Sequence, residues 1–170
     1  MKWLRFAYQG KTGFGTLDGD SVAVHAGDMF GTCAPTGEHI GISDIEWLTP
    51  SQPSKMIGLW NNFRAAAEKN GNAIPPEPLY FIKGANSYCA HRQPIMAPKS
   101  HDGRVIYEGE LAVVIGKIAS GVSVEQAPAH IFGYACANDV TAPELLNRDT
   151  SFAQWTRAKS FDTFGVFGPV

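Results

Sequence analysis

The sequence is short of charged residues and has no long apolar run, and both shortages exclude classes of protein. Charged residues make up 18% of the 170 positions, against roughly 25% in typical soluble domains. The net charge of −2 gives no electrostatic basis for binding nucleic acid or an anionic membrane. No stretch approaches the roughly 20 apolar residues of a membrane span. Charges at Lys2 and Arg5 come too early for a signal peptide, so we expect a cytoplasmic protein.

The sequence also has few cysteines and none of the common motifs for nucleotide binding or for a serine nucleophile. Cys33, Cys89 and Cys136 are odd in number and widely spaced, and no CxxC pair occurs. This pattern indicates reduced thiols in a reducing compartment rather than a disulfide framework. The sequence contains no P-loop, no GxGxxG and no GxSxG, which argues against nucleotide binding and a serine nucleophile.

Glycine and proline are abundant instead, with 18 and 11 residues, and they predict short strands joined by many loops. The first part of the chain resembles a β-meander, with strands at 3–8, 13–17 and 21–25 and a hairpin turn at 18–20. Residues 26–55 are expected to form a loop with one short element at 45–48. The prolines at 50 and 53 suggest a boundary between a small N-terminal β unit, 1–53, and a main body, 54–170.

The main body is expected to be mainly β, with little helix. We predict strands at 56–60, 79–82, 103–116 and 131–138, the first and last of them buried and the third with a buried far end. A helix should begin at Asn62 as its cap and end at Gly71. Pairs spaced by three residues, Ser123 with Gln126 and Thr141 with Glu144, resemble capping boxes.

The most informative chemistry lies in two glutamates before an apolar run. Glu108 and Glu110 are two apart, so on a strand they lie on one face with Cα atoms roughly 6.6–7 Å apart. Like charges repel there, and a divalent cation would relieve the repulsion. The alternative is a solvated pair on an edge strand, which is the commoner case for a bare Glu-x-Glu.

Two further residues add to this candidate site. Asp139 closes an apolar strand, where an acid needs a partner; three carboxylates suit Mg²⁺ or Mn²⁺. The alternative for Asp139 is an acid at a helix N-terminus. Lys159 lies in an aromatic, weakly charged segment, where it could be buried or could bind a substrate carboxylate. The alternative, which the sequence alone favours, is an ordinary surface lysine.

Three segments together resemble the fumarylacetoacetate hydrolase family, in particular its 2-hydroxyhepta-2,4-diene-1,7-dioate isomerases and acylpyruvate hydrolases. They are Tyr107 to Lys117, Ile131 to Ala142 and Gln154 to Phe164, and their order and spacing agree from about residue 55 onward. The resemblance implies a mixed α+β, mainly β fold, a partial fumarylacetoacetate hydrolase-like β-roll, and a homodimer. The family's C-terminal β-rich segment has no counterpart here, so we expect the chain to be the front part of a longer protein.

The resemblance also implies a chemistry. Mg²⁺ or Mn²⁺ would be held by Glu108, Glu110 and Asp139, Lys159 would be catalytic, and Lys83 would help to bind substrate. Family members act on small 2-oxo or diketo acids, and some belong to the catabolism of aromatic compounds. An ion chelated by a 2-oxo acid stabilises an enolate, which serves isomerisation, tautomerisation and decarboxylation.

This chain departs from the family pattern at two places. Where the family has a His and a Glu that activate water, this chain has Ala66 and Lys69. Where the family has an Arg and a Gln after the metal-binding Asp, this chain has Pro143 and Leu146, so the anchoring of the substrate must differ. Enolate chemistry without attack by water is therefore favoured. The alternatives are C–C bond hydrolysis with another base, such as His91 or Glu68, and a non-catalytic family member.

Overall fold

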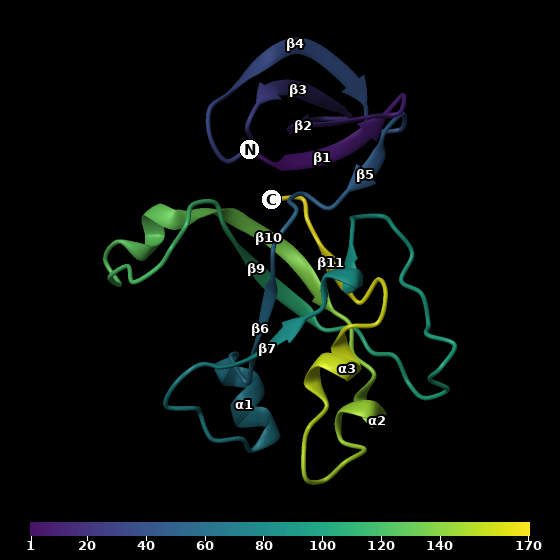
Figure 1. The fold of residues 1–170 in the computed structure, drawn as a ribbon, viewed down its shortest axis with the longest axis vertical. Coiled ribbons are helices and arrows are strands. Elements are labelled where there is room, and N and C mark those ends of the chain that lie inside the picture. The colour runs from purple at the N-terminus through teal and green to yellow at the C-terminus, as the bar shows by residue number, and fades with distance from the viewer.

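The computed structural model describes residues 1–170 and shows three β-sheets with short helices gathered at one end of the molecule (Figure 1). The mixed, mainly β fold class expected from the sequence is confirmed. No helix combines the length and the hydropathy that crossing a lipid bilayer requires.

The N-terminal unit is a five-stranded antiparallel sheet of order β4-β3-β2-β1-β5. Its strands are β1 (Trp3–Tyr8), β2 (Lys11–Asp18), β3 (Ser21–Gly27), β4 (Cys33–Gly41) and β5 (Glu46–Leu48). The predicted meander and the short element at 45–48 are confirmed. The prediction of a loop over 26–44 is wrong, because β4 pairs with β3 there. Most residues of β4 are exposed, so its sequence lacks the apolar alternation that marks a half-buried strand.

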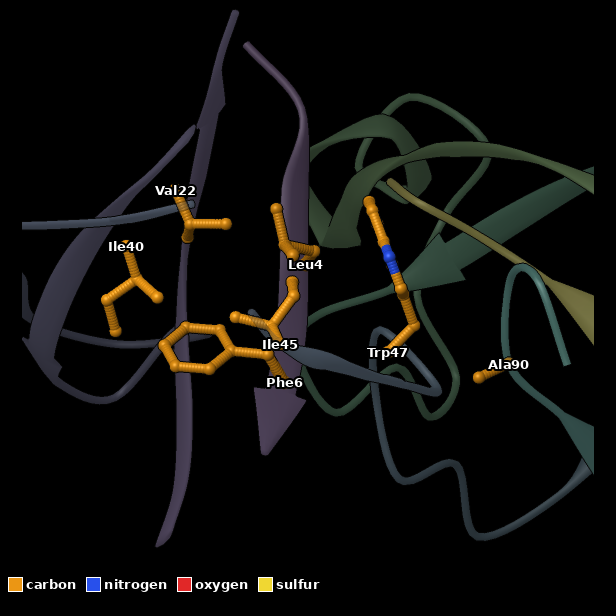
Figure 2. Close-up of a cluster of buried hydrophobic side chains, with 7 residues drawn as sticks. All are labelled: Leu4, Phe6, Val22, Ile40, Ile45, Trp47 and Ala90. Carbon is orange, nitrogen blue, oxygen red and sulfur yellow. The ribbon is translucent and has the colours of Figure 1, made fainter. Parts of the chain in front are cut away.

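One face of this sheet carries the larger of two hydrophobic clusters, shown in Figure 2. Its members are Leu4, Phe6, Val22, Ile40, Ile45, Trp47 and Ala90. Ala90 comes from the main body, so the cluster joins the two parts of the chain. The backbones of Trp3 and Val170 also exchange two hydrogen bonds, which fix β1 against the end of the main body.

The main body contains a four-stranded and a two-stranded sheet. The first has the order β8-β11-β10-β9, from β8 (Tyr88–Cys89), β11 (Gly165–Phe167), β10 (Ile131–Asp139) and β9 (Gly109–Ile115). The second pairs β6 (Met56–Trp60) with β7 (Leu79–Lys83). The helices are α1 (Arg64–Asn70), α2 (Pro143–Leu146) and α3 (Trp155–Lys159), with 3₁₀ turns at Ala85–Ser87 and Ala127–His130. Val140, Ala142, Leu145, Ala158 and Phe164 form a second buried cluster beside α2 and α3.

The predicted helix ends are partly wrong. Helix α1 ends at Gly71, whose φ of 68° closes the helix as expected. Its N-cap is Phe63 rather than Asn62, and no side chain caps it. The Ser123–Gln126 pair does form reciprocal hydrogen bonds of 3.3 Å, as a capping box should. Thr141 caps no helix. The N-cap of α2 is Ala142, and the hydroxyl of Thr141 instead accepts a hydrogen bond from the buried Lys159.

The predictions of buried strands are also wrong for much of β6, β9 and β10. Strand β9 begins at Gly109 rather than 103, and alternate side chains on it are exposed. Leu111 is 63%, Val113 49% and Ile115 55% exposed, and Tyr134, opposite Val113 on β10, is 55% exposed. These four side chains form one apolar face at a sheet edge, because β9 is the outermost strand.

We predict that the 170-residue chain self-associates through this face, since a contiguous apolar patch on an edge strand favours pairing with a second copy. Replacing Leu111 and Val113 together by lysine should shift the sedimentation coefficient towards that of a monomer. Ile118→Lys, a change at a 93% exposed residue beyond the strand, is the matched control and should not. A wild-type chain that sediments as a monomer and unfolds cooperatively would contradict this prediction.

Candidate active site

The candidate site lies where the ends of β9 and β10 meet, and the pairing of these strands brings its acids together. Asp139 donates its backbone N–H to the carbonyl of Glu108 at 3.0 Å, and Ala137 pairs with Glu110. Asp139 is therefore opposite Glu108, and directly opposite residues share a face. Glu110, two residues from Glu108, lies on that face as well. All three carboxylates line one cleft of about 260 Å³.

Two lysines reach the same carboxylates from β7 and α3. Lys159 Nζ lies 2.8 Å from Glu108 Oε2 and 2.6 Å from Asp139 Oδ2. Lys83 Nζ lies 2.5 Å from Asp139 Oδ1, so Asp139 bridges both ammonium groups. Both lysines are only 2% exposed. Lys159 is therefore buried, and the alternative of an ordinary surface lysine is wrong.

The two lysines lie close together because each shares a face of its element with an aromatic residue, and these two aromatic residues pack on each other. Phe81 and Lys83 are two apart on a strand, whereas Trp155 and Lys159 are four apart on a helix; each pair shares a face. The rings of Phe81 and Trp155 stack at 5.4 Å, and both lysines meet at Asp139. Gly165, opposite Asp139 on β11, leaves room for Lys83, whose Cε would be 3.3 Å from a Cβ there.

The segments after the two lysines are also tied to each other. The backbone N–H of Gly84 donates to Ser160 Oγ at 2.8 Å, and Asn86 Nδ2 donates to the carbonyl of Ser160 at 2.8 Å. These bonds fix the end of β7 against the end of α3. The distance between Lys83 and Lys159 is thus set by the backbone as well as by the ion pairs.

Every donor of Lys159 is already used. An ammonium group has three N–H donors, and here they meet Glu108, Asp139 and the hydroxyl of Thr141 at 2.7 Å. Thr141 in turn donates to the carbonyl of Asp139. Sequence reasoning missed this role of Thr141; its position two residues after Asp139 was the available signal.

Electrostatics at the site favour one more positive charge. Three carboxylates face two ammonium groups, and Glu110 takes part in none of the ion pairs. Burial raises the pKa of Glu110, and repulsion from Asp139 and Glu108 adds to the rise. Burial also lowers the pKa of Lys83, against the attraction of Asp139.

The oxygen atoms of this donor set are of the chemical type that binds a divalent cation. The oxygens of Glu108, Glu110 and Asp139 are the ligands that Mg²⁺ and Mn²⁺ prefer, and the unpaired Glu110 provides the charge that a cation would neutralise. As they stand, the three side chains are not gathered closely enough to form a ligand cluster, since Lys159 lies between Glu108 and Asp139. The metal site therefore stays a prediction.

The walls of the cleft include residues that the sequence marked as departures. Ala66 and Leu146 both line it, in positions where the family resemblance expects polar groups. The two alternative bases do not line it: Glu68 is absent from the wall, and His91 packs on Trp47 at 4.9 Å. Trp60, Phe81 and Trp155 do line the cleft, although the sequence favoured a core role for Trp155.

A second hollow of about 330 Å³ borders the same rings. Its walls are Trp60, Leu79, Tyr80, Phe81 and Trp155. It contains no carboxylate, lysine or histidine, whereas the cleft described above holds three acids and a lysine.

Comparison with known proteins places these features in a family. The profile described as fumarylacetoacetate (FAA) hydrolase C-terminal matches residues 55–170, and one described as Rv2993c-like, N-terminal, matches residues 1–50. Oxaloacetate tautomerase YisK of Bacillus subtilis is 33% identical over 162 residues, which are 90% of this chain and 53% of that protein. Oxaloacetate tautomerase FAHD2B, mitochondrial, of Homo sapiens is 34% identical over 129 residues, 75% of this chain and 40% of that protein.

The fold is shared with solved structures. The crystal structure of 5-carboxymethyl-2-hydroxymuconate delta-isomerase from Mycobacterium smegmatis superposes with a TM-score of 0.85 at 32% identity, covering 99% of this chain and 65% of that one. This chain spans between 40% and 65% of the length of the curated relatives it matches.

Proposed function

This chain belongs to the fumarylacetoacetate hydrolase family, and from that premise we propose that it interconverts the enol and keto forms of small 2-oxo acids. Relatives named as tautomerases and isomerases support an activity of this type. Decarboxylation of a 2-oxo acid that carries a second carboxylate on C3, such as oxaloacetate, breaks the bond to that carboxylate, releases CO₂ and leaves an enolate of the same kind; we include this related reaction in the proposal.

The observation that carries the proposal is the combination of a buried lysine among carboxylates with Ala66 in the cleft wall. Hydrolysis needs a base that takes a proton from water, and such a base typically contributes 10²–10⁴-fold. The methyl group of Ala66 cannot take a proton. Tautomerisation needs no water, so the loss of that base does not oppose it.

Each charged residue of the site has its own role in the proposed reaction. Glu108, Glu110 and Asp139 would hold Mg²⁺ or Mn²⁺, which when bound polarises the oxygens of a 2-oxo acid and so stabilises negative charge on them. Lys159 gives a proton to the enol carbon and receives the proton of the enol hydroxyl, so that the lysine is unchanged at the end. Lys83 holds Asp139 in place and acts through it.

Lys159 must exchange one of its three present partners for the substrate before it acts, because all of its donors are used. Glu108 and Asp139 are the partners that a cation would also engage. The carboxylates that would hold the ion are thus the ones that now hold Lys159.

The test compares two reactions in one preparation. With Mg²⁺ or Mn²⁺, decay of the oxaloacetate enol should be accelerated far more than cleavage of acetylpyruvate, and EDTA should abolish the acceleration. Ala66→His should raise acetylpyruvate cleavage at least about tenfold by restoring a base in the cleft.

Ala65→His is the matched control, because Ala65 is the exposed neighbour on α1 and does not line the cleft. Rapid cleavage of acetylpyruvate by the wild type, with no gain from Ala66→His, would show that another residue is the base and that the assignment is wrong.

A further inference from the structure

Two chemically different groups of residues line the cleft. One group, called the floor here, is charged and consists of Glu108, Glu110, Asp139 and Lys159. The other group, called the wall, comes mainly from residues 59–72 together with Phe81, Leu146 and Trp155, and none of its members is charged. A 2-oxo acid whose reacting end lies on the floor would therefore extend its other end into an uncharged region.

Aromatic rings dominate that region and are held in place. Trp155 stacks on Phe81 at 5.4 Å and meets Trp60 edge to face at 6.1 Å. Phe81 lies across Gly58 of the neighbouring strand, where a Cβ would come within 2.3 Å of the ring. Lys159 Nζ is 5.0 Å from the centre of the same ring, so the aromatic wall adjoins the reacting end.

The polar groups of the wall are amides. The cleft is lined by Asn61, Asn62, Asn70 and Asn72. Of their side-chain amides, only that of Asn61 forms a hydrogen bond within the chain, which it donates to the carbonyl of Ala73 at 2.9 Å. Amides donate and accept hydrogen bonds without adding charge. They suit a neutral carbonyl or hydroxyl group on a ligand.

No cation is available for a second carboxylate. Lys159 is the only basic residue that lines the cleft, and its three donors are used. An unpaired carboxylate is costly to remove from water. A dicarboxylic substrate such as oxaloacetate is thus disfavoured relative to one with an uncharged substituent.

We propose that the preferred substrate is a 2-oxo acid with an uncharged aromatic or apolar substituent, which packs on Trp60, Phe81 and Trp155. This inference rests on the proposed function, because it assumes that the reacting end occupies the charged floor. Aromatic rings at these distances favour the edge-on and offset contacts that another ring can extend.

The experiment compares phenylpyruvate with oxaloacetate in the tautomerase assay at fixed Mg²⁺. We expect kcat/KM to be higher for the phenylpyruvate enol. Trp60→Ala should raise KM for phenylpyruvate about 10-fold more than KM for oxaloacetate. Phe63→Arg, which places a cation at a half-exposed position of the wall, should raise kcat/KM for oxaloacetate relative to phenylpyruvate by about 10-fold. Phe152→Ala, at an exposed phenylalanine outside the cleft, is the control and should change neither.

A wild-type preference for oxaloacetate, or equal effects of Trp60→Ala on both values of KM, would overturn the inference and leave the proposed function standing. Calorimetric titration of phenylpyruvate in Mg²⁺ separates the remaining cases. Binding that Trp60→Ala weakens, without turnover, would support the inference and contradict the proposed function. Absence of binding would overturn the inference directly.

Discussion

Replacing Lys159 by alanine should lower turnover of the 2-oxo acid enol by about 10²–10⁴-fold, the usual contribution of a positioned proton donor. The expected loss is large because Lys159 is the only basic side chain that lines the cleft, and it lies against Glu108 and Asp139. The three hydrogen bonds that Lys159 donates also fix the side chains of Glu108, Asp139 and Thr141 relative to one another.

The same variant should bind Mn²⁺ at least as tightly as the wild type, because the three carboxylates that would ligate the ion remain and Lys159 no longer occupies Glu108 and Asp139. Enzyme kinetics and calorimetric titration of Mn²⁺ measure the two effects separately. Lys117→Ala, at an exposed lysine just beyond β9, is the matched control. Unchanged turnover in Lys159→Ala would remove Lys159 from the mechanism.

Asp139→Asn should lower the free energy of unfolding by about 3–5 kcal/mol, the usual effect of removing one partner from a buried ion pair. Asp139 is the only residue bonded to both lysines, and the change would leave Lys83 buried without a carboxylate. Urea denaturation in EDTA measures this effect without any contribution from a bound metal ion.

A second substitution identifies the cause. In Asp139→Asn/Lys83→Met, the buried cation is removed as well, so the double variant should be at least about 1 kcal/mol more stable than the sum of the single changes predicts. Asp102→Asn, at an exposed aspartate without an ion pair, should be within about 0.5 kcal/mol of the wild type. A loss below about 1 kcal/mol for Asp139→Asn would contradict the bridging role.

The acids of the site could be predicted from the sequence because their placement follows from local geometry. Alternation along one strand puts Glu108 and Glu110 on a face, and the position of Asp139 at a strand end puts it near an edge. The pairing of those two strands in antiparallel register was the only tertiary fact needed. The roles of these acids as metal ligands stay a prediction.

The lysines could not be placed in the same way. Their burial depends on α3 packing beside β7, which no periodicity in either segment specifies. The exposed faces of β6 and β9 were misjudged for a related reason, since an apolar run is typical of burial but says nothing about what covers it. Strand β4 was missed because most of its residues are exposed and only Ile40 is buried, so no apolar alternation marks it.

The division between the charged floor and the aromatic and amide wall has a consequence for how such a protein diversifies. The floor is fixed by strand pairing, by ion pairs and by the bonds from Gly84 and Asn86 to Ser160. Helix α1, in the middle of the wall segment, buries only Ala67. Mutations that accumulate between residues 59 and 72 can therefore change which molecules are accepted at little cost to folding, and a library restricted to this segment is the economical route to new specificities.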